Sequence, residues 1–122
     1  MPPIIYGDGK QTRDFVYVDD VVEANMLALN KVKAAGEVFN IGTGTNISVN
    51  QVAETLKEIM NKEDLKNVHD APRPTDIRHG YADIRKAKKI LGYTPKFSFK
   101  EGMAQLVNWY ITYKHLPDGT HN

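Results

Sequence analysis

The 122-residue sequence contains no cysteine, one tryptophan and no long run of apolar residues. Without cysteine the chain forms neither a disulfide nor a thiolate zinc site, which is compatible with the cytoplasm. The lack of a run of about 18 apolar residues excludes an ordinary transmembrane helix. Charged residues begin at Asp8, so the sequence does not start like a secretory signal peptide. We therefore expect a cytoplasmic protein with no membrane partner.

The sequence also lacks an excess of charge of either sign, because it contains 16 Lys and Arg residues and 15 Asp and Glu residues. A formal net charge of +1 does not supply the clustered positive charge that nucleic-acid binding needs. The four histidines have no metal-ligand spacing, so we expect no metal site. An apolar fraction of 41% and a length of 122 residues are typical of one globular domain.

The stretch from Ile4 to Val18 combines two β-prone runs with a turn. Ile4–Tyr6 and Phe15–Val18 flank Gly7-Asp8-Gly9. Glycine adopts positive φ without a Cβ clash, and aspartate bonds its own backbone, so a tight reversal is favoured. The pattern predicts two strands joined as a hairpin.

The rest of the chain predicts about four helices and two more short strands, which gives an α/β fold class. Glycine ends the third of these helices at Gly92, and the polar tail His115–Asn122 is expected to fray. The last helix should bury one apolar face. The expected helices follow Asp19 or Asp20, the capping box of Ser48 and Gln51, the cap Asp83, and the capping box of Ser98 and Glu101. The expected strands are Glu37–Ile41 and Asn67–His69.

A short glycine-containing turn, Gly42-Thr43-Gly44, follows a strand-like run and precedes a helix. A dinucleotide loop has this placement, but it needs a third glycine where Ile47 stands. We interpret the segment as a structural turn and assign no cofactor-binding residue.

Arg13 is a candidate for phosphate binding, because a guanidinium can donate two parallel hydrogen bonds to a phosphate. The simpler alternative is a surface ion pair, which would contribute little to stability. The carboxylates that could form such a pair are Asp14, Asp19 and Asp20.

Arg73 is a second candidate. It lies between Pro72 and Pro74, which favour extended backbone, and Asp76 follows closely. This spacing suits a cation for phosphate beside an acceptor for a ribose hydroxyl. The alternative is a proline-rich loop with solvated charges.

Two motifs, GDGKQTRDFVYVDDVVEA and APRPTDIRHGYADIRKAKKILGY, carry a family resemblance. In this order they are similar to the C-terminal lobe of nucleotide-sugar epimerases of the extended short-chain dehydrogenase/reductase family, UDP-glucose 4-epimerase in particular. The resemblance implies one substrate-binding lobe over residues 1–122, with the N-terminal NAD-binding Rossmann half missing. It also implies a UDP-sugar or a related nucleotide sugar as partner.

The resemblance also implies roles for individual residues. By the family pattern, Arg13 and Arg73 contact the diphosphate, and Asp76 meets the ribose. Tyr6 and Ile4 lie near the nucleotide base, although both could simply pack as strand residues. Phe15 replaces a tyrosine that is common in the family, so a hydroxyl contact from that ring is absent. Arg78, Tyr81 and Asp83 follow the pattern too, and we interpret them as loop and cap residues.

The complete family enzymes use NAD and a helical Tyr-x-x-x-Lys pair. Tyr6 with Lys10 and Tyr110 with Lys114 have the spacing. We interpret both as coincidental, because glycines break the first segment and no cofactor loop precedes the second. We therefore assign no catalytic residue and do not expect this chain to catalyse a reaction alone.

Several functions remain open at this point. The lobe could belong to a nucleotide-sugar dehydratase, decarboxylase or reductase, which share it with the epimerases. It could also be a non-catalytic binding or interaction module. A lobe without its partner half should expose apolar surface and self-associate.

Overall fold

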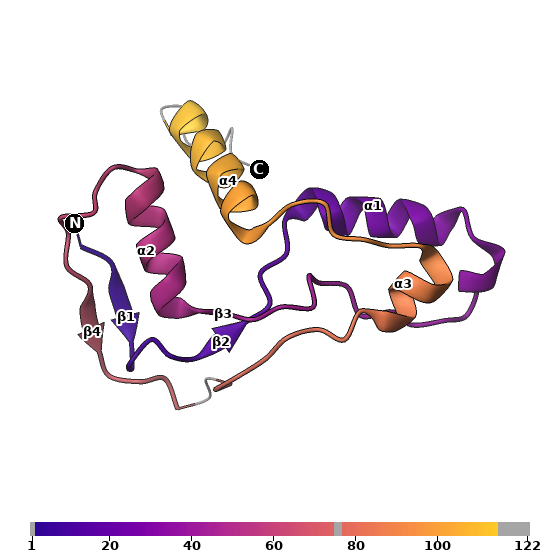
Figure 1. Cartoon of the computed structure of the whole chain (residues 1–122), viewed down its shortest axis with the longest axis horizontal. Coiled ribbons are helices and arrows are strands. Elements are labelled where there is room, and N and C mark those ends of the chain that lie inside the picture. Colours follow the sequence, from indigo (N-terminus) through magenta and orange to yellow (C-terminus); the bar gives the residue numbers. More distant parts are fainter. Residues whose placement is uncertain (1, 75–76, 115–122) are drawn as a thin grey trace.

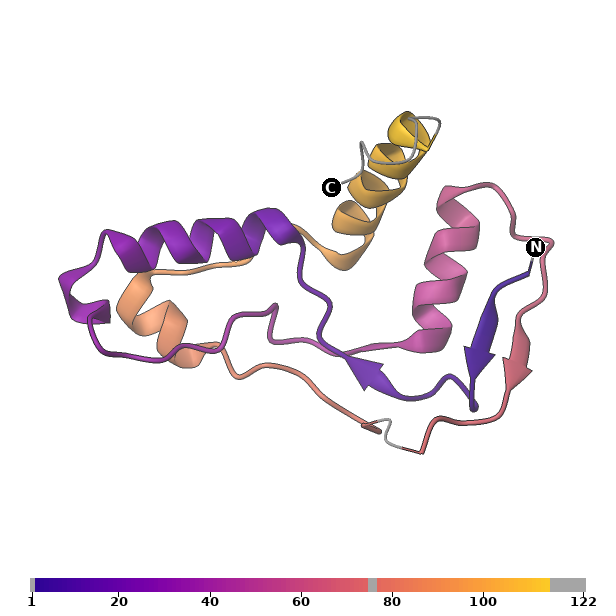
Figure 2. The same cartoon turned by 180° about the vertical axis from the view of Figure 1, so that it is seen from behind.

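The chain folds into an α/β structure whose short strands and helices gather mainly at two ends of the molecule (Figures 1 and 2). A computed structural model describes residues 2–74 and 77–114. β1, β4 and α2 lie at one end, α1 and α3 lie at the other, and α4 projects between them (Figures 1 and 2). In chain order the elements are β1 (Ile4–Tyr6), β2 (Thr12–Arg13), α1 (Val18–Leu29), the 3-10 helix η1 (Val32–Ala34), β3 (Ile47–Ser48), α2 (Val49–Ile59), β4 (Val68–Asp70), α3 (Arg85–Leu91) and α4 (Phe99–Tyr113).

Both strand pairs join segments that are distant in the sequence. β1 pairs with β4 in parallel, with Ile5 opposite His69. β2 pairs with β3 in antiparallel fashion, with Arg13 opposite Ile47. In β1 the side chain of Ile5 is buried while its two neighbours are exposed, as alternation along a strand requires.

The hairpin expected between residues 4 and 18 is wrong. Gly7 and Gly9 do adopt positive φ and turn the chain. After the turn, however, the backbone finds other partners: the Val49 N–H donates to the carbonyl of Gln11. The segment Phe15–Val18 is not a strand, and α1 already begins at Val18. Local β propensity did not decide the pairing, because it depends on tertiary contacts.

The start of α1 also differs from the expectation. Its N-cap residue is Tyr17, and no side chain caps the helix there. Asp20 is buried instead, and its carboxylate accepts hydrogen bonds from the N–H groups of Lys96 at 3.0 Å and Phe97 at 3.2 Å. Asp20 therefore fastens α1 to the segment that leads into α4, and these two bonds compensate for its burial.

Both predicted capping boxes are confirmed. Ser48 accepts from the Gln51 N–H at 3.1 Å, and the Gln51 side chain accepts from the Ser48 N–H at 2.8 Å. Ser98 and Glu101 form the same reciprocal pair at the start of α4. Because these bonds use only residues three apart, the sequence predicts them directly.

At α3, the predicted glycine end is confirmed, and Gly92 adopts the left-handed conformation. The N-cap residue is Ile84 rather than the expected Asp83, although the Asp83 carboxylate accepts from the Arg85 N–H at 3.1 Å. The strand expected at Asn67–His69 is present one residue further along, as β4.

Two other expectations are corrected. Glu37–Ile41 forms no strand, and its side chains Phe39 and Ile41 pack against the core instead. The apolar face expected on α4 is only partly buried: Val107 is buried, whereas Leu106 and Tyr110 are 52% and 60% exposed. The tail His115–Asn122 lies outside the described residues.

The main buried cluster lies where α1, η1 and α3 meet. Its largest member, Tyr93, is 1% exposed and donates its hydroxyl to the carbonyl of Gly42 at 2.7 Å. This bond ties the residue after α3 to the loop between η1 and β3. The cluster consists of Ala24, Ala34, Ile84, Ala87, Leu91 and Tyr93.

We predict that Tyr93→Phe lowers the free energy of unfolding by about 1–3 kcal/mol, because the buried Gly42 carbonyl loses its donor. Urea denaturation measures the change. Tyr110→Phe is a matched control, since Tyr110 is 60% exposed, and it should leave the free energy of unfolding unchanged.

The difference between wild type and Tyr93→Phe should also depend on pH. Burial, together with the nearby carboxylates Asp20 and Asp14, raises the pKa of Tyr93 from 10.0 to about 12. The neutral phenol is therefore favoured in the folded state, so its contribution is full below pH 10 and is lost as the pH rises through 12. A difference that stays constant across this range would contradict the assignment.

Candidate functional site

Four of the five predicted site residues line one cavity. A hollow of about 260 Å³ is bounded by Ile4, Tyr6, Arg13 and Arg73. The other residues of its wall are Ile5, Gln11 and Val49. The fifth predicted residue, Asp76, lies outside the described residues. The two candidate arginines, distant in the sequence, therefore meet at the same surface feature.

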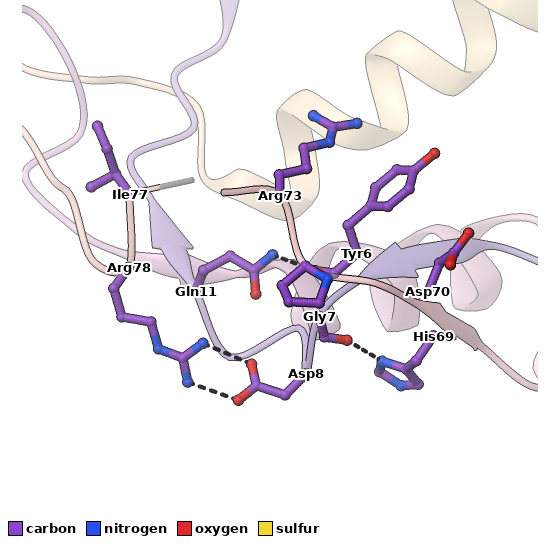
Figure 3. Close-up of a pocket in the computed structure, with 10 residues that line it drawn as sticks. Tyr6, Gly7, Asp8, Gln11, His69, Asp70, Arg73, Ile77 and Arg78 are labelled. Carbon is purple, nitrogen blue, oxygen red and sulfur yellow. Dashed lines mark hydrogen bonds and ion pairs between the residues drawn. The ribbon is translucent and has the colours of Figure 1, made fainter. Parts of the chain in front are cut away.

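Arg73 lies against the ring of Tyr6, with its guanidinium carbon 4.4 Å from the ring centroid. This is a cation–π contact. In Figure 3 both side chains point to the same side of the turn that follows β1. The neighbouring proline packs closely on that turn, since a Cβ on Gly7 would lie 3.4 Å from the Cβ of Pro72.

Arg13 leaves β2 and is held by backbone carbonyls. One terminal nitrogen of its guanidinium donates to the carbonyls of Thr12 and Ile77. Two of the carboxylates considered as ion-pair partners accept from backbone N–H groups instead: Asp20 does so as described above, and Asp14 accepts from Thr43, Gly44 and Ala82. The carbonyl contacts fix the direction in which Arg13 presents its charge.

The segment after Asp76 runs beside β2, which explains why the two arginines converge. The Thr12 N–H donates to the Arg78 carbonyl at 2.9 Å, and the Gly80 N–H donates to the Thr12 carbonyl at 3.1 Å. The Thr12 hydroxyl is also 3.1 Å from Nδ1 of His79. The chain therefore leaves β4 next to β1, carries Arg73, and returns to β2.

The turn Gly42-Thr43-Gly44 holds a carboxylate of the protein itself. The N–H groups of Thr43 and Gly44 both donate to Asp14 at 2.9 Å, and the Thr43 hydroxyl donates to it at 2.6 Å. A Cβ on Gly42 would lie 2.6 Å from an Asp14 oxygen. Burial alone would raise the pKa of Asp14, but these bonds and one from Ala82 outweigh it and lower that pKa.

This turn does not fit the pyrophosphate of NAD, because the N–H donors that would face it are already bonded to Asp14. The sequence suggests Asp14 only as a partner of Arg13 and does not predict this role. Its only sequence signal was the glycine-bounded turn, which does not by itself identify the acceptor.

A second, larger cavity of about 830 Å³ shares Tyr6, Gln11 and Arg73 with the first. Figure 3 shows its wall. The His69 ring donates from Nδ1 to the Gly7 carbonyl at 2.8 Å. The residues that line only this cavity are Gly7, Asp8, His69, Asp70, Pro72, Ile77 and Arg78.

A bidentate ion pair crosses this wall. Arg78 donates from both terminal nitrogens to Asp8, each at 2.8 Å. From the sequence Arg78 is expected to be a loop residue, and no local signal predicts its pairing with Asp8. The bond from Arg78 is the largest cause that holds the pKa of Asp8 well below its usual range, so the pair is charged near neutral pH.

Neither Tyr-x-x-x-Lys match forms a helical pair beside the two cavities described above. Tyr6 is in β1 and Lys10 lies beyond the glycine turn. Tyr110 and Lys114 line a separate hollow at the C-terminal end of α4 with Trp109 and Tyr113.

Within residues 2–74 and 77–114, no three His, Asp or Glu side chains gather as metal ligands would. In the same part of the chain, no helix has the length and apolar character that crossing a bilayer requires.

Comparison with known proteins gives a consistent result. The family model described as GDP-mannose 4,6 dehydratase matches residues 1–106. The solved UDP-glucose 4-epimerase of Thermotoga maritima, in complex with UDP-glucose, is 45% identical, with a TM-score of 0.86 over 93% of this chain and 36% of that chain. Human dTDP-D-glucose 4,6-dehydratase is 42% identical over 115 residues, which are 87% of this chain and 31% of that protein.

A third relative, the UDP-glucuronate 4-epimerase of Thermodesulfobacterium geofontis, is 39% identical over 112 residues, covering 88% of this chain and 33% of that protein. The chain thus spans about a third of the length of the curated relatives it matches. These relatives are nucleotide-sugar epimerases and a dehydratase, and the α/β arrangement of short strands and four helices in the described residues matches that of the solved epimerase. The chain therefore belongs to the GDP-mannose 4,6-dehydratase family, among the UDP-glucose 4-epimerase-like members of the extended short-chain dehydrogenases/reductases.

Proposed function

We propose that this chain is the nucleotide-sugar-binding part of an NAD-dependent UDP-glucose 4-epimerase-like enzyme, a single lobe over residues 1–122. The observation that supports this best is that Arg13 and Arg73 line one cavity together with Tyr6 and Ile4. A similar epimerase has been solved with UDP-glucose, and other similar structures contain a UDP-sugar with NAD.

The two arginines provide the chemistry that a diphosphate needs. A diphosphate carries several negative oxygens, and a guanidinium offers five N–H donors in a fixed plane. Backbone carbonyls orient Arg13, and the Tyr6 ring supports Arg73. A hydrogen bond to a charged group contributes on the order of 1.5–3 kcal/mol, so two arginines on one diphosphate would dominate the affinity.

The remaining residues would recognise the nucleoside. The ring of Tyr6 and the side chain of Ile4 give the cavity an apolar wall suited to the flat base. We assign the ribose contact to Asp76 from the family pattern, because an ionised carboxylate accepts hydrogen bonds from hydroxyl groups. Ile5, the buried residue of β1 between Ile4 and Tyr6, also lines this cavity.

This lobe would anchor the substrate rather than transform it. In the complete enzyme, NAD supplies the acceptor and donor of a hydride at the sugar. The glycine turn of this chain does not fit that cofactor, so we propose no catalytic residue here. Holding the remote diphosphate would use binding energy to position the sugar. The cytoplasmic location expected from the sequence stays a prediction.

A dehydratase, decarboxylase or reductase is the main alternative, and the 42% identity to the human dehydratase supports considering it. The cavity residues would contact the nucleoside diphosphate and not the sugar, so they do not discriminate between the sugars. A non-catalytic binder is the second alternative, supported by the apolar surface that the helices expose.

We predict that Arg13→Ala and Arg73→Ala each weaken UDP binding by about tenfold or more, because each removes a charged hydrogen-bond donor from the diphosphate. Isothermal titration calorimetry on the 122-residue chain measures the dissociation constant. Arg85→Ala is the matched control, since Arg85 pairs with Asp83 at the start of α3 and does not line the cavity. Equal affinities for wild type and the two cavity variants would contradict the proposal.

The same titration compares nucleotides. Uridine should bind much more weakly than UDP if the diphosphate carries the affinity. Comparison of UDP with dTDP and GDP tests the assignment against the dehydratase alternatives. Preference for dTDP or GDP would reject the UDP-glucose assignment while keeping the diphosphate site.

Self-association is a further part of the proposal. One face of α1 carries four exposed apolar side chains: Val18, Val22, Met26 and Leu29. Their spacing places them on one stripe of the helix. We propose that a second copy of the chain covers this stripe, because a continuous exposed apolar stripe favours association.

Sedimentation velocity tests this directly. Val22→Asp and Met26→Asp should shift the chain toward monomer, because association would bury a carboxylate without a partner. Thr94→Asp adds the same charge at an exposed loop position and should leave the distribution unchanged. A monomeric wild type at all concentrations would reject this part.

A further inference from the structure

The ion pair between Asp8 and Arg78 connects the two segments that carry the candidate arginines. Asp8 lies in the turn between β1 and β2, so it precedes Arg13 by one short segment. Arg78 follows Arg73 in the segment that returns from β4 to β2. Figure 3 shows the pair on the wall of the larger cavity, on the other side of the turn from Tyr6 and Arg73.

Both partners of the pair are themselves held by the backbone. The Asp8 carboxylate also accepts from the Lys10 N–H at 2.9 Å, which fixes it within the turn. The carbonyl of Arg78 accepts from the Thr12 N–H. A bidentate bond between two groups held in this way restricts distance and orientation at once.

We propose that Asp8 and Arg78 are positioning residues that set the separation of Arg13 and Arg73 for the diphosphate. The inference rests on the proposed function and names residues that act on it without touching the ligand. The pair is suited to this role because it crosses from the turn to the returning segment, which otherwise lies exposed at residues 77–79.

The pair is poorly placed to serve global stability. The two side chains are 55% and 48% exposed, and ion pairs of this kind contribute little to the free energy of unfolding. The ion pair of Arg85 with Asp83 has the same chemistry, at 2.7 Å, at the start of α3. It joins residues two apart in the sequence and therefore connects no distant segments, which makes it a matched control.

If Arg78 were instead a direct phosphate ligand, the change in UDP affinity caused by Asp8→Asn would have the opposite sign. If Arg78 bound the diphosphate itself, Asp8→Asn would release Arg78 and remove a negative charge from the cavity wall. Binding of UDP would then become tighter. If the pair positions the two arginines, Asp8→Asn weakens binding although it makes the site more positive.

The experiment is a double-mutant cycle on the 122-residue chain, with UDP as the probe in calorimetry. We expect Asp8→Asn and Arg78→Gln each to weaken binding by about threefold to tenfold, and the double variant to lose no more than either single variant, as coupled partners do. The swapped pair Asp8→Arg with Arg78→Asp should regain part of the affinity. Asp83→Asn and Arg85→Gln should leave it unchanged.

Amide hydrogen exchange provides a readout that does not need ligand. Asp8→Asn should speed exchange of the Thr12 and Gly80 N–H groups, which bond across the two segments. Exchange in α4 should not change. Unchanged exchange at Thr12 and Gly80 overturns the inference, as does tighter UDP binding by Asp8→Asn or additive losses in the double variant.

The outcomes separate this inference from the proposed function. If wild type binds UDP and Arg13→Ala weakens it, but Asp8→Asn binds like wild type, only the positioning role fails. If wild type does not bind UDP, the proposed function fails and the role of the pair in ligand binding fails with it. Faster exchange in that case would show a structural pair alone.

Discussion

The parallel pairing of β1 with β4 determines how the rest of the site is arranged. This pairing places the end of β4 beside Tyr6, so the segment carrying Arg73 must start there and cross the turn at Gly7. Its return along Thr12 then brings it to the backbone of Arg13. Arg13 and Arg73 are distant in the sequence, and they line one cavity because β1 pairs with β4, which follows α2 in the chain.

The carboxylates of Asp8, Asp14 and Asp20 accept hydrogen bonds from backbone N–H groups in turns and loops. Asp14 binds the glycine turn that could otherwise resemble a cofactor loop, and Asp20 binds the segment before α4. Asp8 accepts from the turn that contains it and from Arg78. Asp14 and Asp20 accept from backbone N–H groups that lie outside the strands, which suits a fold with few and short strands.

The shortness of the strands affects how the candidate phosphate site is held in place. A phosphate site needs donors held in fixed directions, and long strands or helices usually provide that rigidity. Here the carbonyls around Arg13 and the ring beneath Arg73 provide it locally. The diphosphate binding that we propose would therefore depend on loop contacts rather than on long strands or helices.

The sequence by itself determined the elements whose signals are local: the capping boxes at Ser48 and Ser98, the glycine end at Gly92 and the α/β class. It also pointed to Arg13, Arg73, Tyr6 and Ile4 through their motifs. Tertiary structure decided the partner of β1, the burial of Asp20, the acceptor role of Asp14 and the pairing of Asp8 with Arg78. Each of these joins residues far apart in the chain, and short-range propensity carries no information about which distant group will satisfy a given donor or acceptor.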